Sequence, residues 1–340
     1  MYRKYYGLRH KPFELAPVGG RMYLSESHRE ALATLRYGVI ANKGFLLLTG
    51  GVGTGKTTVL NTLLGMLKDK VRVCVLNNPT LDKHEFFSYL SGEFGLPYKK
   101  NKGAFILDFA NFLKSYAKEG GKVLLIIDEA QAFSLNMLEE IRLLSNHAGE
   151  KNALSIFLIG QPELQDQLAD PILLPLRQRI GLKHHLEPLT ENDTAQYIAY
   201  RLNRAGAVNS AIFSSDAVST IHKESRGNPR LINIICDHAM ISGFNHELKT
   251  INTNVIDDCI KEIKLQKEKK LQGSDLQNKS NITLKIIGKQ FNISKTFAGI
   301  ITVILILTLI ISAAYEFAPQ SWWQYFTTIL NPIIEIIKKV

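Results

Sequence analysis

Residues 45–57 read FLLLTGGVGTGKT, an apolar run that leads directly into a glycine-rich loop closed by a lysine and a threonine. The loop, residues 50–57, is a complete Walker A sequence, which requires a buried strand before it and a helix after it. The apolar run supplies a strand at 44–49, and we expect the helix to begin near Lys56. This order of elements predicts that the chain binds a nucleoside triphosphate.

The residues of the loop suit the chemistry of a triphosphate. Gly50, Gly53 and Gly55 let the backbone turn tightly and direct N–H groups toward phosphate oxygens, and the dipole of the following helix adds positive potential. Lys56 is expected to reach the β- and γ-phosphates, and the Thr57 hydroxyl to bind Mg²⁺. The predicted site for ATP and Mg²⁺ consists of Gly50, Gly51, Val52, Gly53, Thr54, Gly55, Lys56, Thr57, Thr58 and Asp128.

Two strand ends add candidate hydrolytic residues. Residues 122–129 read KVLLIIDE, an apolar strand that ends in two acids. Asp128 can hold the Mg²⁺ shell, and Glu129 can orient or deprotonate the attacking water. Gln161 follows a strand at 154–160 and is interpreted as a sensor of the γ-phosphate, with a merely polar strand end as the alternative.

Arginines near two helix ends are candidates for phosphate contacts. Residues 176–180 read LRQRI, where Arg177 or Arg179 can reach the nucleotide of a neighbouring subunit and stabilise transition-state charge. Arg230, in the GNPR sequence at 227–230, can contact the γ-phosphate from a second domain. The alternative for each is an arginine at the surface of a helix end.

Apolar runs and helical patterns alternate up to residue 188, as a parallel α/β sheet requires, and the pattern is all-helical afterwards. The predicted strands are 44–49, 72–77, 123–128, 154–160 and 182–187. The predicted helices are 25–41, 56–68, 83–94, 105–118, 135–145, 190–204, one from Ser214 or Ser215, 229–243 and 253–269. We therefore expect an α/β nucleotide-binding domain at 1–188 and a helical lid domain at 189–267. The aromatic N-terminal segment, with Tyr5, Tyr6 and Phe13, is expected to pack on the core or against adenine.

The net charge of +10 is concentrated in one stretch. Residues 261–295 contain nine lysines against three acids, while the rest is nearly balanced, so a basic nucleic-acid-binding domain is not indicated. The polar part, 268–296, reads as a flexible basic linker whose lysines are either solvated or in contact with anionic lipid. The three cysteines, Cys74, Cys236 and Cys259, lack metal-ligand spacing and are expected to be buried and reduced.

Residues 297–315 read FAGIITVILILTLIISAAY, without a charge. At 1.5 Å per residue this segment spans about 28 Å, close to a bilayer core of about 30 Å. Lys285, Lys289 and Lys295 precede it and Glu316 follows, which places the N-terminal domains in the cytoplasm. We expect a single-pass inner-membrane protein whose residues 316–340 form a short extracytoplasmic or interfacial tail.

The order of the Walker loop, the acidic strand end, Gln161, LRQRI and GNPR resembles the AAA+ superfamily. The flanks YYGLRHKPFELAP, MYLSESHREALATLRYGV, IIDEAQAFS and FLIGQPEL are similar to the ExeA/GspA group of secretion ATPases and to MshM-type ATPases of pilus assembly. The resemblance covers about residues 1–265. It implies ATP-dependent homo-oligomers, with Arg179 as the finger that acts in trans and Arg230 as the second sensor. It also implies a transmembrane helix followed by a peptidoglycan-binding domain, for which the 25 residues after 315 are too short; a separate partner protein would supply that part.

The sequence thus predicts a membrane-anchored ATPase that assembles or remodels an envelope complex of the secretion or pilus type. The alternatives are a DNA-associated regulator of the transposition type and a scaffold that binds ATP with little turnover. The lack of a recognition motif argues against nucleic acid as a partner, and the presence of Glu129 and Arg179 argues against the scaffold.

Overall fold

The computed structural model describes residues 2–14, 22–67, 70–77, 81–98, 100–147, 153–207 and 211–265. The described residues up to Ile263 belong to one compact unit. The predicted linker at 268–296, the apolar segment at 297–315 and the tail at 316–340 lie outside the described residues. Within the described part of the chain, no helix is both long and apolar enough to cross a bilayer.

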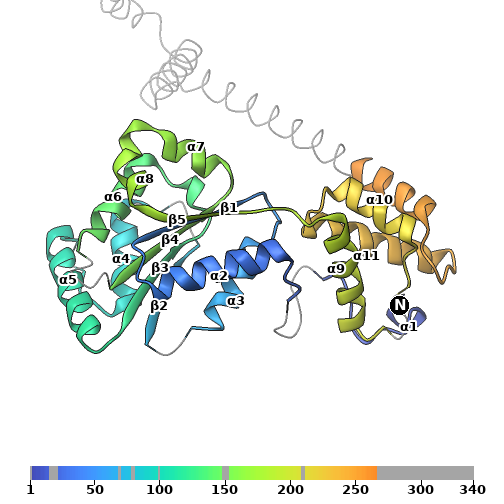
Figure 1. Ribbon diagram of the computed structural model, residues 1–340, viewed down its shortest axis with the longest axis horizontal. Helices are drawn as coiled ribbons and strands as arrows, with labels where there is room; N and C mark the ends of the chain where they lie inside the picture. Colours follow the sequence, from blue (N-terminus) through green and yellow to red (C-terminus); the bar gives the residue numbers. More distant parts are fainter. Residues whose placement is uncertain are drawn as a thin grey trace, which may run out of the picture. The chain divides into compact units, whose positions relative to one another are not determined.

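The described residues contain a parallel sheet of five strands (Figure 1). Its strands are β1 (Phe45–Gly50), β2 (Val71–Leu76), β3 (Lys122–Ile127), β4 (Leu154–Gly160) and β5 (Ile180–Leu186), in the order β2-β3-β4-β1-β5. All four neighbouring pairs are parallel. The five predicted strands are therefore confirmed, with ends that differ by at most two residues. Because the strands are parallel, the residues directly after β1, β3 and β4 lie at the same edge of the sheet.

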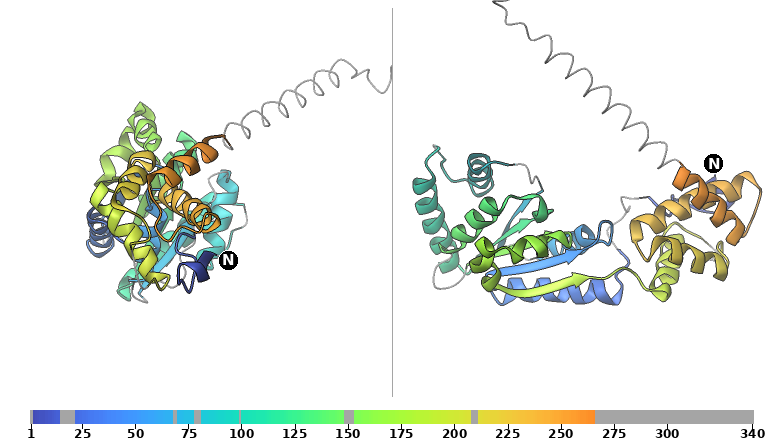
Figure 2. Two further views of the ribbon diagram at one scale, coloured as in Figure 1. Left: turned by 90° about the vertical axis from the view of Figure 1, so that its right-hand side faces the viewer. Right: turned by 90° about the horizontal axis from the view of Figure 1, so that it is seen from above.

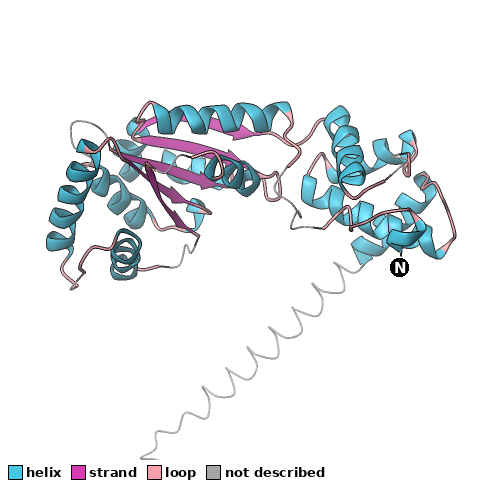
Figure 3. Cartoon of the chain, turned by 90° about the horizontal axis from the view of Figure 1, so that it is seen from below, coloured by secondary structure: helices cyan, strands magenta, loops and turns pink. Residues whose placement is uncertain are grey.

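Helices cover both faces of this sheet, and Figure 3 shows the strands between the two helical layers. The first layer contains α2 (Glu26–Ile40) and α3 (Lys56–Leu64), which pack on Leu46 and Leu48 of β1. The second packs on Phe45 and Leu47, the alternate residues of the same strand. It contains α4 (Lys83–Phe94), α5 (Lys102–Lys118), the turn η1 (Ala130–Ala132), α6 (Leu135–Ser145), α7 (Glu163–Ala169), the turn η2 (Pro171–Leu173) and α8 (Leu174–Arg179).

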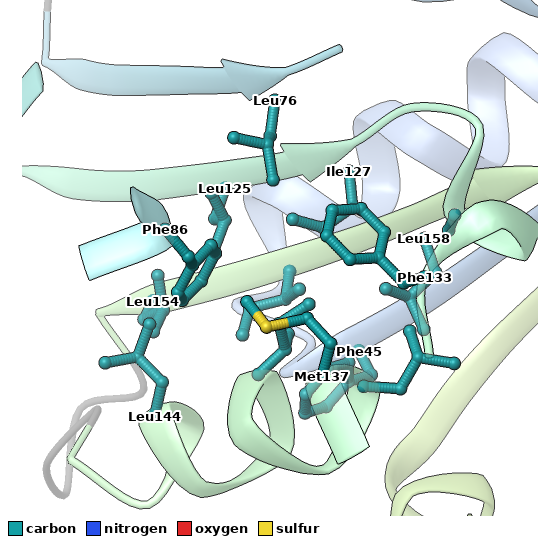
Figure 4. Packing of buried hydrophobic residues seen from close by; sticks show 14 of the residues in the cluster. Phe45, Leu76, Phe86, Leu125, Ile127, Phe133, Met137, Leu144, Leu154 and Leu158 are labelled. Carbon is teal, nitrogen blue, oxygen red and sulfur yellow. The ribbon is translucent and has the colours of Figure 1, made fainter. Parts of the chain in front are cut away.

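The core of the second layer is rich in large side chains (Figure 4). Phe86, Phe133 and Met137 belong to one cluster with Leu125 and Ile127 of β3, and all of them are buried. Since both faces of β3 are covered, its residues are apolar without alternation, which is the pattern of a buried parallel strand.

Several helices differ from the sequence prediction. The helices α7 and α8 were not predicted, because each is shorter than two full turns and prolines at 162, 171 and 175 interrupt the pattern. Helix α3 ends at Leu64 rather than near Lys68, because Gly65 caps it by donating its N–H to Asn61. Helix α5 begins three residues earlier than predicted, where the Asn101 side chain accepts from Ala104 N–H.

The helical part follows β5 and contains α9 (Glu191–Arg204), α10 (Ser215–Ser225), α11 (Pro229–Asn245) and a helix at 253–265. The N-terminal segment, with α1 (Tyr2–Tyr5), packs into this part, and Figure 2 shows the N-terminus beside these helices. Tyr2, Leu8 and Phe13 belong to its buried core, and the Tyr2 hydroxyl donates to Asp237 at 2.5 Å. Residues 2–13, which we assigned to the 1–188 domain, therefore contribute to the core of the helical part.

The cysteines of the chain agree with their prediction: all three are free and buried. Burial raises the pKa of the Cys74 thiol to about 12. A thiol of this kind is protonated at neutral pH and behaves as a small apolar side chain.

Candidate active site

The Walker loop connects the carboxyl end of β1 to α3, where the sequence predicts it. Gly53 and Gly55 have φ angles of 79° and 104°, in the left-handed region that favours glycine. A Cβ atom at Gly55 would lie 2.6 Å from Nε2 of His28, and one at Gly53 would lie 2.7 Å from Oδ1 of Asn228. Both positions therefore require glycine for conformation and for space, and both line the cavity described below.

Lys56 lies inside the loop. Its side chain is buried, and its ammonium donates to the carbonyl oxygens of Gly50 at 2.8 Å and of Gly51 at 3.0 Å. Burial lowers the pKa of Lys56, while the carboxylates of Glu129 and Asp128 act in the opposite direction. The lysine is thus held at the loop by groups that a triphosphate can replace.

Asp128 stands directly after β3 and is buried. One carboxylate oxygen accepts the backbone N–H of Glu129 at 2.9 Å, and the side chain is hydrogen-bonded to Thr57. Burial raises the pKa of Asp128, and these hydrogen bonds together with Lys56 act against that effect. A threonine hydroxyl beside an aspartate carboxylate is the oxygen pair with which a phosphate-binding site of this type holds Mg²⁺, so the residues fit that ion.

Glu129 has a left-handed backbone with a φ angle of 52°, which is uncommon for a residue with a side chain. One carboxylate oxygen, Oε2, accepts from Nε2 of Gln131 at 2.6 Å and from Nε2 of Gln161 at 3.3 Å. Burial raises the pKa of Glu129, but the two amide donors and the charge of Lys56 outweigh it, so the pKa lies below its usual value. The carboxylate is therefore ionised at neutral pH, the state that a general base requires.

A cavity of about 480 Å³ opens at this edge of the sheet, between the Walker loop and the helical part. Its volume is in the range of small-molecule sites. The charged residues of its lining are five cations and two acids: Lys11, Lys56, Arg201, Arg204, Arg230, Glu14 and Glu129. Aromatic side chains of Tyr23, Tyr197 and Tyr200 line it as well. A cationic cavity with an aromatic wall suits a nucleoside polyphosphate.

The start of α11 lies against the Walker loop. The Asn228 side chain donates to the carbonyl oxygen of Val52 at 2.5 Å, and its Oδ1 accepts the backbone N–H groups of Arg230 and Leu231. A Cβ atom at Gly53 would lie 2.8 Å from the Cβ of Arg230. Arg230, the predicted second sensor, is exposed and lines the cavity.

Arg179 lies at the opposite edge of the sheet from the Walker loop. It ends α8, immediately before the amino end of β5, whereas Leu186 at the other end of β5 pairs with Gly50 of the loop. Arg179 is exposed, donates to the Ser145 hydroxyl at 2.9 Å and is not part of the cavity lining. Seven residues of β5, about 23 Å of strand, separate it from the loop. Arg177 on the same helix is exposed too.

The structure adds contacts that the sequence did not indicate. His28 of α2 is buried, its Nε2 lies 3.0 Å from the carbonyl oxygen of Thr54, and its Nδ1 lies 2.6 Å from the Ser25 hydroxyl. Since a carbonyl only accepts, Nε2 carries the proton and Nδ1 accepts from Ser25. Gln131 and Asn228 were also not singled out. Gln131 stands two residues after Glu129, and Asn228 belongs to GNPR. Each therefore lies within a motif for which the sequence predicts a role only for the charged residue.

Comparisons with known proteins agree with this geometry. Residues 40–168 match the model of a family described as an AAA domain. Over 247 residues the chain is 42% identical to General secretion pathway protein A of Aeromonas hydrophila, an alignment that covers 72% of this chain and 45% of the relative. The chain thus spans about half the length of that curated relative.

Solved structures with a similar fold include Cdc6p of Pyrobaculum aerophilum, at 18% identity and a TM-score of 0.53 over 71% of this chain and 67% of that chain. The ORC2 protein of Aeropyrum pernix, in its ADPNP–ADP complexes, is similar at 15% identity and a TM-score of 0.55, over 74% of this chain and 71% of that chain. At these identities the likeness shows the fold alone.

Proposed function

This chain is an AAA protein related to General secretion pathway protein A, and on that premise we propose that it hydrolyses ATP in the cavity beside the Walker loop. The observation that carries the proposal is the meeting of Lys56, Asp128 and Glu129 at one edge of the sheet, around a cationic cavity. A binding module needs the first two of these residues, whereas an ionised glutamate beside them serves hydrolysis.

Each residue has one task in this proposal. Lys56 and the backbone of the loop bind the β- and γ-phosphates, while Thr57 and Asp128 hold Mg²⁺. When bound, that ion neutralises charge on the phosphate oxygens. Glu129 orients the attacking water and accepts its proton. Gln161 and Arg230 contact the γ-phosphate from β4 and from the helical part.

The proposal includes a second copy of the chain. Arg179 lies at the amino edge of the sheet, one strand length from its own loop, so any nucleotide that it serves belongs to another subunit. An arginine that reaches across an interface to transferring phosphate contributes about 10³–10⁵ in rate. We therefore propose a homo-oligomer whose nucleotide sites are shared between neighbours.

Hydrolysis is tested with Glu129→Gln, which keeps the size of the side chain and removes the base. We expect nucleotide affinity to be retained and turnover to fall at least hundredfold, measured as phosphate release. The matched control is Glu163→Gln in the first turn of α7, an exposed carboxylate near Lys56 that binds no reacting group. Equal turnover of Glu129→Gln and wild type would contradict the mechanism, and binding without turnover in the wild type would indicate the scaffold instead.

The cellular role rests on the relative and on residues 297–315. We propose that the protein is anchored in the inner membrane by that segment and uses ATP to assemble or remodel an envelope complex of the secretion or pilus type. The expected result is that the full chain sediments with membranes after alkaline extraction, while a chain ending at residue 267 does not. Recovery of the full chain in the soluble fraction would contradict the anchor and leave the ATPase proposal intact.

A further inference from the structure

Three side chains from the ends of β3 and β4 form a small hydrogen-bonded cluster beside the cavity. Gln131 donates from Nε2 to Oε2 of Glu129 at 2.6 Å, and its Oε1 accepts the backbone N–H of Gln161 at 3.0 Å. The side chain of Gln161 donates to the same Glu129 oxygen at 3.3 Å. One amide, that of Gln131, therefore contacts both the proposed base and the proposed sensor.

The surroundings hold Gln131 in this position. The main-chain carbonyl oxygen of Gln131 accepts from the Gln167 side chain of α7 at 2.8 Å. Gly160, the last residue of β4, leaves the room for its amide, because a Cβ atom there would lie 2.7 Å from Oε1 of Gln131. The half-buried Gln131 is thus fixed from its backbone and from its tip.

We propose that Gln131 is a positioning residue for hydrolysis, which anchors one oxygen of Glu129 and aligns Gln161 with it. The inference rests on the proposed function. Both amides bond to Oε2, and among the described residues no hydrogen bond reaches Oε1 of Glu129. A carboxylate held by one oxygen presents the other to water in a fixed direction, which is the requirement for an oriented general base.

The first test is Gln131→Glu, which keeps an oxygen for the Gln161 N–H and replaces the donor to Glu129 by a like charge. We expect kcat for ATP to fall about tenfold or more, because a hydrogen bond to a charged group is lost, with ATP affinity within about twofold of wild type. The control is Gln165→Glu, which makes the same exchange at a glutamine bonded to the Thr49 hydroxyl.

The second test leaves Gln131 unchanged and uses Gly160→Ala, which displaces its amide. This variant is expected to lower kcat as well, and it keeps the inference testable if the first variant folds poorly by circular dichroism. An unchanged or raised kcat in either folded variant overturns the positioning role, and so does a loss of ATP affinity in Gln131→Glu that matches the fall in kcat. Wild-type turnover and its loss in Glu129→Gln show separately that the proposed function holds.

Discussion

The two edges of the sheet have similar chemistry and different tasks. At the carboxyl edge Lys56 donates to two main-chain carbonyls, those of Gly50 and Gly51. At the amino edge Lys122 also donates to two carbonyls, those of Val39 and Ile40 at the end of α2. The carbonyls of Gly50 and Gly51 belong to a loop that lines a cavity. The carbonyls of Val39 and Ile40 lie at the end of a helix, where Lys122 satisfies them.

The two edges differ in whether one chain supplies all the groups that the proposed site needs. The carboxyl edge brings together the Walker loop, the proposed Mg²⁺ ligands and the proposed base within one chain. The amino edge offers Arg179, exposed and about a strand length away. We propose that one chain supplies the groups for binding and a second chain supplies a group for rapid turnover, and the predictions below test this from the largest effect to the smallest.

The largest effect is expected for Arg179→Ala, with a loss of about 10³-fold in kcat and little change in ATP affinity. If Arg179 serves a neighbour, mixing this variant with Glu129→Gln restores turnover to about a quarter of wild type at random assembly, since one site in four then has both groups. Phosphate release from the 1:1 mixture is the measurement. Arg177→Ala is the control, and inactivity of the mixture would contradict a shared site.

Lys56→Ala is expected to weaken ATP binding at least hundredfold, because the only loop cation near the phosphates is lost. The matched variant Lys122→Ala removes a lysine with the same two-carbonyl contacts from the opposite edge. It is expected to keep ATP affinity. Its free energy of unfolding is expected to fall by about 1 kcal/mol, because the two carbonyls at the end of α2 lose their donor. Fluorescent-nucleotide titration and denaturant unfolding distinguish the two, and equal binding loss in both would erase the distinction between the edges.

Two variants of His28 that differ in side-chain length test its contact with the carbonyl oxygen of Thr54. His28→Gln places an amide nitrogen near the position of Nε2 and can still donate to Thr54, whereas the shorter His28→Asn cannot. We expect the asparagine variant to bind ATP about fivefold more weakly and the glutamine variant to stay near wild type, since about 1 kcal/mol attaches to this hydrogen bond. His222→Asn in the helical part, where a histidine contacts the Thr194 hydroxyl, is the control. Equal affinities of the two His28 variants would exclude the contact as the cause.

The smallest effect concerns Asn228, which caps α11 and also holds Val52. Asn228→Ser keeps a capping oxygen but cannot reach the loop, whereas Asn228→Ala loses both. Alanine is expected to cost about 1 kcal/mol in stability and serine much less, with ATP affinity lowered about twofold in both. Thermal unfolding and nucleotide titration measure the two quantities. An intact affinity in the serine variant would show that the helix cap alone matters.

Much of the sheet was predictable because its strands are buried on both faces. Continuous apolar runs such as residues 123–127 and 154–159 leave little choice of element, and the loop and acids follow directly from their ends. The short helices α7 and α8 were missed, because six or seven residues contain too few turns to establish a period.

The site was predictable where a residue acts by its own charge and not where it acts through a neighbour. Lys56, Asp128 and Glu129 lie at the predicted edge. The role of Gln131 depends on β4 lying beside β3, because its partner Gln161 is thirty residues away in the sequence. His28 depends on α2 lying against the loop, which no pattern within 25–41 reveals.

The contact between Tyr2 and Asp237 has a consequence for how the protein is made. The two residues are 235 positions apart, and both lie in the helical part. At ribosomal rates of about 5–20 residues per second, the first residues wait roughly 12–47 s for their partner to be synthesised. During that interval the aromatic side chains of Tyr2 and Phe13 have no complete core to enter, so closure of the helical part waits for the segment that contains Asp237.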